Sequence, residues 1–389
     1  MKEAVIVSAV RSPVGKGKKD GALASVHPAI LTARVIAAAV EKAGIRKEDV
    51  DDVIMGCAMP EAAQGLNMAR LATLKAGLPV EVSATTVNRF CSSGLQTIAL
   101  GAQGIMSDML DTAVVGGFEM MSQVPMSGYH TRLHPELTES YIGMGFTAER
   151  VAERWKVSRQ DQDAYALDSQ KKAAAAWQAG RFSGEIVPID VEQVTWKGAE
   201  KQERTVSVDR DELVRADTTM EGLAKLKPAF KANGTVTAGN ASPYSDGAAA
   251  LVMTSREKAE AEGLPILARF VNFATSGVDP DIMGIAPIMA VPKALKRAKM
   301  SLADIDLIEM NEAFAAQALA VARVLEMDQS RLNVNGGAIA LGHPLGATGG
   351  KLATQLIHEL RRRGGGMGLV TMCVGGGMGA AGIFEVYGA

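Results

Sequence analysis

The chain has 389 residues, 47% of them hydrophobic, so it is long enough to bury two cores, and its composition excludes disordered and fibrous classes. Its formal net charge of −2 offers no basic stripe for a phosphodiester backbone, so nucleic acid is not expected as a partner. The three cysteines, at positions 57, 91 and 373, lack metal-ligand spacing, which argues against a metal site and a disulfide framework and indicates a reducing, cytoplasmic compartment.

Residues 1–11 hold too short an apolar run for a signal peptide and are predicted to form a first buried strand. No apolar stretch approaches membrane-spanning length, so no membrane partner is expected. The chain then repeats itself loosely. An acidic turn and a short apolar strand follow a helical run twice, in residues 46–56 and again in residues 300–310. The order of apolar residues and glycines in 111–117 is also similar to that in 369–376. These pairs lie about 255 residues apart, which predicts an internal duplication of an α/β unit.

Cys91 lies where a β-like segment, residues 82–87, gives way to apolar residues at helical spacing in residues 95–105. We therefore expect Cys91 on a strand-to-helix turn, where the positive end of the helix favours the thiolate and lowers the pKa of the thiol. A nucleophilic cysteine is one interpretation of this pattern. A buried structural cysteine is the other.

The composition of the chain changes over residues 119–247, and we interpret this segment as an inserted domain. A capped, Ala-rich helix is predicted from Ser158 to Ala179, and the charged stretch 192–210 predicts an exposed face. The segment ends in a loop of small residues, 237–247. Such a loop either lets a ligand approach the backbone closely or simply joins two domains.

Three further stretches carry candidate chemistry. Asn311 and Glu312 follow a buried strand, where ligands bind in α/β sheets, although Glu312 can also be read as a helix cap. His343, between a glycine and a proline before a helix at 349–363, is either a general base with a pKa near neutrality or a surface histidine. Glycines 375–377 follow Cys373 and can aim N–H groups at an oxyanion. Residues 377–382 also spell GxGxxG, but too little chain follows for a dinucleotide fold.

A nucleophilic cysteine, a base, a second cysteine and an oxyanion turn together favour acyl transfer through a thioester. With these residues in place, the sequence resembles the thiolase family over essentially its whole length. Six motifs in order carry the resemblance: Asn-x-x-Cys-Ser-Ser-Gly at 88–94, Gly-Gly-Phe-Glu at 116–119, Thr-Ala-Gly-Asn-Ala-Ser at 237–242, Asn-Glu-Ala-Phe at 311–314, Gly-His-Pro at 342–344 and Cys-Val-Gly-Gly-Gly at 373–377.

The resemblance implies two homologous βαβαβαββ halves packed as a five-layered α/β/α/β/α core. The implied N-terminal half is residues 1–118 plus about 248–264, and the C-terminal half is 265–389. The implied loop domain, 119–247, lies over a coenzyme A tunnel. The resemblance also implies a homodimer or homotetramer that uses coenzyme A as a substrate and holds no tightly bound cofactor.

By the same resemblance, Cys91 accepts the acyl group, His343 takes its proton, and Cys373 exchanges a proton at the α-carbon of acetyl-CoA. Asn311 is similar to a residue that holds a water for one oxyanion site, and the N–H groups of Cys91 and Gly375 match the second. The implied substrate contacts are Ser242 at the pantetheine arm, Arg215 near the adenine, and Met144, Met283 and Phe314 around the acyl pocket.

The sequence departs from the short-chain pattern of the family at one informative place. Short-chain thiolases carry His-Met-Gly where this chain has Gly143-Met144-Gly145, so a pocket-filling imidazole is missing. We therefore predict a 3-ketoacyl-CoA thiolase of fatty acid β-oxidation, with an acetoacetyl-CoA thiolase as the alternative. A ketoacyl synthase fits less well, because it would need a second catalytic His or Asn where this chain has Cys373 and would lack the inserted loop domain. A disabled coenzyme A carrier fits less well, because all four catalytic candidates are present.

Overall fold

The computed structural model describes residues 2–125, 133–198 and 200–389. The N-terminal half of the chain builds five strands in the order β4-β3-β5-β8-β1. Strand β3 runs parallel to β4 and β5, whereas β8 runs antiparallel to β5 and β1. The strands are β1 (Ala4–Arg11), β3 (Asp52–Gly56), β4 (Ser83–Val87), β5 (Thr112–Met120) and β8 (Ser245–Ser255), with the short β2 (Gly15–Lys16) paired to β8.

The C-terminal half repeats this arrangement, which confirms the predicted duplication. Its order is β10-β11-β12-β9, with β10 parallel to β11 and with β12 antiparallel to both β11 and β9. Leu332 forms a parallel bridge to Ile308, at the place that β4 takes in the first half. Among the described residues, the strand pairing between the halves consists of two residue pairs, between β1 and β9. The strands are β9 (Ala268–Gly277), β10 (Leu307–Met310), β11 (Gly365–Val374) and β12 (Met378–Tyr387).

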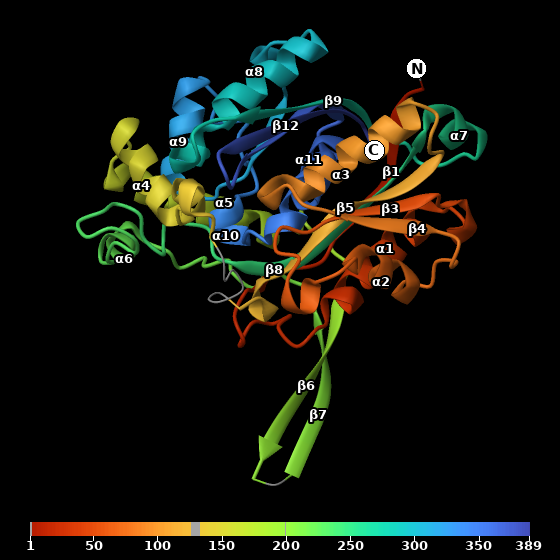
Figure 1. Ribbon diagram of the computed structural model, residues 1–389, viewed down its shortest axis with the longest axis horizontal. Coiled ribbons are helices and arrows are strands. Elements are labelled where there is room, and N and C mark those ends of the chain that lie inside the picture. The colour runs from red at the N-terminus through yellow and green to blue at the C-terminus, as the bar shows by residue number, and fades with distance from the viewer. Residues whose placement is uncertain (1, 126–132, 199) are drawn as a thin grey trace.

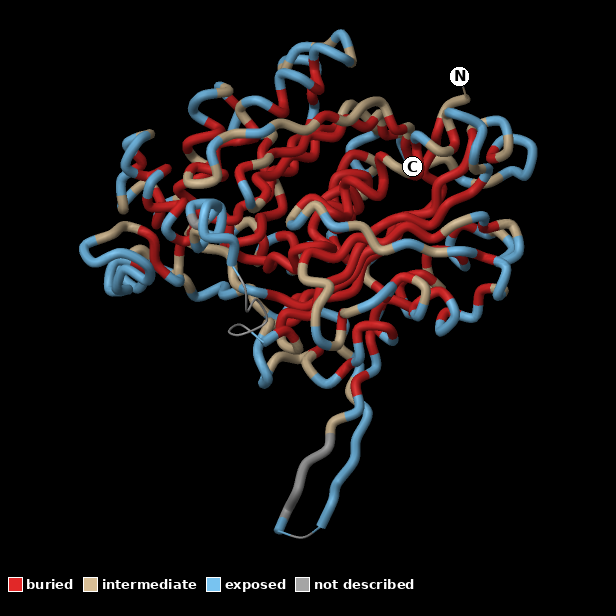
Figure 2. Tube along the Cα trace, in the orientation of Figure 1, coloured by how far each residue is buried: buried red, intermediate tan, exposed pale blue. Residues whose placement is uncertain are grey.

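Helices divide the molecule into five layers, as the family resemblance implied. Helices α3 (Ser93–Met106) and α11 (Thr348–Arg362) lie between the two halves and share one apolar core with strands of both. Helices α1 (Pro28–Ala43) and α2 (Met68–Lys75) cover the outer face of the first half, and α8 (Pro287–Ala298) and α9 (Ala315–Val324) cover that of the second. Because helices cover both faces, the strands β1, β5, β8 and β10 are buried along their whole length (Figure 2).

The segment between β5 and β8 contains α4 (Met144–Arg154), α5 (Arg159–Gln178), the hairpin of β6 (Ile189–Lys197) and β7 (Glu200–Val208), and α6 (Met220–Ala224). The Ser158 side chain caps α5 at its predicted start. The predicted charged stretch forms the hairpin, which extends away from the body as an arm (Figure 1). Buried Arg11 anchors the base of this arm through Glu185 at 2.7 Å and Asp211 at 2.8 Å.

Two short helices complete the fold, α7 (Arg256–Ala261) after β8 and α10 (Ala338–Leu341) before the loop that carries His343. Among the described residues, none of the helices combines the length and the apolar character that crossing a membrane requires. The division of the chain into domains at residues 119, 248 and 265 stays a prediction.

Candidate active site

One apolar cavity of about 230 Å³ brings most of the predicted site residues together. Cys91, His343 and Cys373 line it, although they come from three distant parts of the chain. Four predicted substrate contacts line it as well: Met144, Ser242, Met283 and Phe314. Arg215 lines a neighbouring cavity of about 270 Å³, and the two cavities share Ala241 and Pro243 as wall residues.

Cys91 sits in a tight turn between β4 and α3, where the sequence predicted it. The turn is a single 3-10 segment, Phe90–Ser92, which leads directly into α3. Phe90 has a φ of +43°, an uncommon conformation for a non-glycine residue, and it fixes the direction of the chain just before Cys91. Hydrogen bonds hold this conformation, because the Phe90 N–H donates to Asn88 Oδ1 at 2.7 Å and Ser93 Oγ donates to the Phe90 carbonyl at 2.6 Å.

The predicted lowering of the Cys91 pKa is wrong for the structure without substrate. Removal from water raises the pKa of the thiol to about 12, and the Glu119 carboxylate acts in the same direction. The N–H of Gly375 acts oppositely, because it donates toward the Cys91 sulfur. Desolvation is the largest of these effects, so the neutral thiol is the favoured form of Cys91 at neutral pH.

His343 is buried beside Cys91 and not on the surface. Burial, followed by the nearby cation of Lys351, lowers the pKa of its imidazole to about 3, so the predicted pKa near neutrality is wrong. Nδ1 lies 2.6 Å from Thr348 Oγ1, whose own hydroxyl donates to the Pro344 carbonyl at 3.0 Å. This network places the proton on Nδ1 and leaves the lone pair on Nε2, as a base requires.

Asn311 lies behind His343 at the end of β10 and is fully buried. Its Nδ2 is 3.3 Å from His343 Nε2, and its Oδ1 has no hydrogen-bond partner in the protein. The neighbouring Glu312 does not cap α9, as one interpretation had it. Its carboxylate instead accepts hydrogen bonds from Ser169 Oγ at 2.7 Å and from Asn333 Nδ2 at 2.9 Å, which ties α5 to the end of β10.

Cys373 ends up opposite Cys91 because β11 carries it to the same edge of the molecule. Its side chain is fully buried, and desolvation raises the pKa of its thiol, followed by the effect of Cys91. The chain then turns through Gly376 and Gly377, with φ of +77° and +80°. A Cβ on Gly377 would lie 2.2 Å from the Val278 carbonyl, so only glycine fits this turn.

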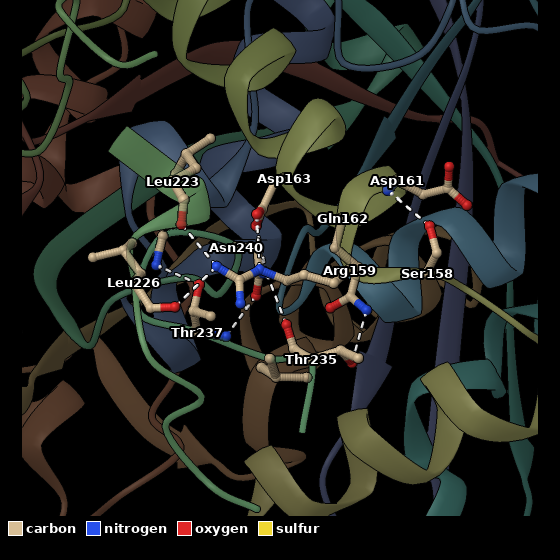
Figure 3. A network of polar contacts seen from close by, with 12 residues as sticks. Ser158, Arg159, Asp161, Gln162, Asp163, Leu223, Leu226, Thr235, Thr237 and Asn240 are labelled. Carbon is tan, nitrogen blue, oxygen red and sulfur yellow. Dashed lines mark hydrogen bonds and ion pairs between the residues drawn. The ribbon is translucent and has the colours of Figure 1, made fainter. Parts of the chain in front are cut away.

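A polar network fixes the wall of small residues between the two cavities (Figure 3). Asn240 Nδ2 donates to Asp163 on α5 at 2.9 Å, and Asn240 Oδ1 accepts from the Thr237 N–H at 2.8 Å. Arg159 bonds the same Asp163 at 2.7 Å and also reaches two carbonyls around α6. The Ser242 hydroxyl donates to the Ala313 carbonyl at 2.9 Å. The loop 237–242 is therefore a rigid wall and not a loose domain-joining turn.

Sequence reasoning gave no role to several residues of the site. Thr348 sets the tautomer of His343, and Phe230 and Tyr244 line the cavity. Thr348 lies in the same Gly-rich stretch as His343, so its spacing of five residues was a usable signal. Phe230 lies in a charged segment with no such pattern. Glu119 belonged to a recognised motif, but nothing in the sequence indicated what its carboxylate contacts.

Comparison with known proteins gives a single answer. The family model of the thiolase N-terminal domain matches residues 4–257, and that of the thiolase C-terminal domain matches residues 264–386. The 3-ketoacyl-CoA thiolase of Bacillus subtilis (strain 168) is 54% identical over 392 residues, which cover 99% of this chain and 100% of that protein. The crystal structure of the Bacillus anthracis acetyl-CoA acetyltransferase aligns with a TM-score of 0.90 at 42% identity, with 99% of both chains covered. The human mitochondrial 3-ketoacyl-CoA thiolase aligns with a TM-score of 0.88 at 41% identity, again with 99% of both chains covered. With two matching halves, one cysteine-lined cavity and relatives that span its whole length, this chain belongs to the thiolase family.

Proposed function

We propose that this chain is a 3-ketoacyl-CoA thiolase, which cleaves 3-ketoacyl-CoA with coenzyme A to acetyl-CoA and a shortened acyl-CoA. The observation that carries this assignment is the meeting of two thiols and a neutral imidazole on one apolar cavity. The 54% identity to a protein named 3-ketoacyl-CoA thiolase supports it. The reaction is reversible, so the same groups also serve the condensing direction.

In the first half-reaction, Cys91 attacks the C3 carbonyl of the substrate while its proton passes to Nε2 of His343. The C2–C3 bond then breaks, so the acyl group stays on Cys91 as a thioester and the electron pair leaves with the enolate of acetyl-CoA. Cys373 donates its proton to C2 of that enolate. Its position on the cavity wall supports this role, since a general acid must reach the reacting carbon.

In the second half-reaction, the Cys373 thiolate takes the proton of an incoming coenzyme A thiol. The coenzyme A sulfur attacks the thioester carbonyl, and Cys91 leaves and recovers its proton from His343. The N–H groups of Gly375 and Cys91 hold the oxyanion on Cys91, which is supported by the Gly375 N–H that already points at the Cys91 sulfur. One such donor typically contributes about 3 kcal/mol to the barrier. Asn311, with a water on its free amide oxygen, and His343 hold the other thioester oxygen.

We also propose how the substrate lies. The acyl chain occupies the inner cavity among Met144, Met283 and Phe314, and the pantetheine arm passes Ser242. The nucleotide end lies in the outer cavity near Arg215. Coenzyme A is a substrate here and not a resident cofactor. A homodimer or homotetramer in the cytoplasm, with the loop domain at 119–247, completes the proposal.

An acetoacetyl-CoA thiolase is the second candidate. The similar structure from Bacillus anthracis is named acetyl-CoA acetyltransferase, and this name supports a preference for two-carbon acyl groups. Gly143 favours the longer-chain activity, because it lines the acyl cavity with no side chain of its own.

Thiolysis rates for 3-ketoacyl-CoA esters of four to sixteen carbons would test the proposal, with product masses as the readout. We expect acetyl-CoA plus an acyl-CoA shortened by two carbons, and no turnover by Cys91→Ala. Absence of cleavage for every chain length would refute the assignment, and turnover of the four-carbon ester alone would favour the second candidate.

A further inference from the structure

The Glu119 carboxylate is completely buried at the end of β5, where it accepts hydrogen bonds from five groups. Oε2 accepts from the Ala58 N–H at 2.9 Å and the Gly346 N–H at 2.8 Å. Oε1 accepts from Gln64 Nε2 at 2.7 Å, the Met59 N–H at 3.2 Å and the thiol of Cys57 at 3.6 Å. Burial raises the pKa of Glu119, and the donated hydrogen bonds act against that rise. A protonated carboxyl would point its own O–H at one of these donors, so the hydrogen-bond geometry fits the ionised form.

One side of this carboxylate connects to the turn that carries the nucleophile. The Ala58 carbonyl accepts from Asn88 Nδ2 at 3.1 Å, and Asn88 Oδ1 accepts from the Phe90 N–H at 2.7 Å. Phe90 is the residue with positive φ directly before Cys91. Three consecutive hydrogen bonds therefore run from Glu119 to the residue that sets the direction of the Cys91 turn.

The other side connects to the loop that carries the base. Gly346 lies three residues after His343. Its turn packs closely against the backbone of the loop that contains Ala58, since a Cβ on Gly346 would lie 2.7 Å from the Ala58 nitrogen. Leu345 and Met59 pack against Cys91 in one small apolar cluster. Glu119 is thus bonded directly to the His343 loop at Gly346 and is linked to the Cys91 turn indirectly, through Ala58 and Asn88.

We propose that Glu119 is a positioning residue for acyl transfer, which clamps the Cys91 turn and the His343 loop in one register. It does not line the substrate cavity, so it acts through the two loops and not on the substrate. This inference rests on the proposed thiolase activity. A purely structural carboxylate would affect the amount of folded protein and leave the turnover of the folded fraction unchanged.

The test uses Glu119→Gln in the full-length protein, because glutamine keeps the side-chain length but turns an NH₂ group toward the backbone donors. We expect kcat for thiolysis to fall by roughly 10- to 100-fold per folded site, since a misplacement of about 1 Å costs rate on that scale. KM for coenzyme A should change less than about twofold, because the cavity walls are untouched. Iodoacetamide should alkylate Cys91 at least as fast as in the wild type, because a negative charge that opposes the thiolate has been removed.

Glu359→Gln is the matched control. Glu359 is a buried carboxylate that accepts from Asn335 at 2.8 Å and Arg363 at 2.7 Å, away from the cavity, so its kcat should stay within about twofold of wild type. If Glu119→Gln does not fold, Asn88→Ala breaks the same connection at an exposed residue and should also lower kcat at least fivefold or so. Wild-type kcat in the folded variants, or an equal loss in the control, overturns the positioning role. A wild type that cleaves no 3-ketoacyl-CoA defeats the proposed function instead, and the rate at which acyl-CoA acylates Cys91 in Glu119→Gln relative to wild type then tests the clamp.

Discussion

Gly143→His should convert a longer-chain pocket into a short-chain one. Gly143 lines the acyl cavity, and its φ of −65° and ψ of 139° are open to any residue. A Cβ there meets only the Phe146 ring, at 3.4 Å, which is ordinary van der Waals contact. The substitution therefore adds an imidazole to the pocket region without straining the backbone.

The size of the effect follows from lost burial of the acyl chain. The cavity holds only about 230 Å³, so an imidazole inside it displaces part of a long chain but little of an acetyl group. Each methylene that loses burial costs about 0.8 kcal/mol. Displacement of about three methylenes then costs ~2.4 kcal/mol, or about 50-fold in kcat/KM for the long substrate relative to the short one.

The assay measures kcat/KM for a ten-carbon 3-ketoacyl-CoA and for acetoacetyl-CoA in the same variant, because general damage cancels in their ratio. Gly143→Ala is the control and should leave the ratio within about twofold, since a methyl group fits beside Phe146. An unchanged or increased ratio in Gly143→His would refute the pocket argument and favour the acetoacetyl-CoA thiolase assignment.

Three further predictions concern the two thiols. After mixing with acyl-CoA, peptide mass spectrometry should find the acyl group on Cys91. Cys373→Ser should keep acyl exchange on Cys91 but slow carbon–carbon bond formation by about 100-fold or more, because a hydroxyl is a far weaker proton donor than a thiol. Alkylation of Cys91 by iodoacetamide should keep rising through pH 10, because burial raises the pKa of this thiol to about 12 and the thiolate fraction grows tenfold per pH unit below that value.

Each of these has an outcome that contradicts it. An adduct on Cys57 or Cys373 with none on Cys91 would remove Cys91 as the nucleophile. Equal loss of exchange and condensation in Cys373→Ser would contradict divided roles for the two thiols. An alkylation rate that reaches a plateau near neutral pH would mean that the helix terminus outweighs desolvation after all.

The fold could be predicted because its periodic features lie in local sequence. Strands buried on both faces appear as continuous apolar runs, and the repeated run at residues 300–310 indicated the duplication before any contact was known. The cap of α5 at Ser158 was equally local. The pairing of β1 with β9, which connects the strands of the two halves, depends on long-range packing that no local pattern encodes.

Residue types of the site could be predicted, but their electrostatics could not. Turn geometry indicated Cys91 and His343 from adjacent glycines and strand ends. The predicted pKa was too low for Cys91 and too high for His343, because the cost of removing a charge from water depends on every group packed around it. Glu119 illustrates the same limit, since its donors come from segments up to 227 residues away in the chain.

The two pKa shifts have opposite signs and a common consequence. Burial raises the pKa of Cys91 and lowers that of His343, so both shifts disfavour a thiolate–imidazolium ion pair. A neutral thiol beside a neutral base reacts slowly with stray electrophiles, because the thiolate is the nucleophilic form. In the mechanism we propose, a bound acyl thioester changes this balance, since charge that leaves the thiol during attack collects on an oxygen held by the Gly375 N–H group and not on a desolvated sulfur. That mechanism predicts that Cys91 loses its proton only when a substrate carbonyl is present to receive the charge.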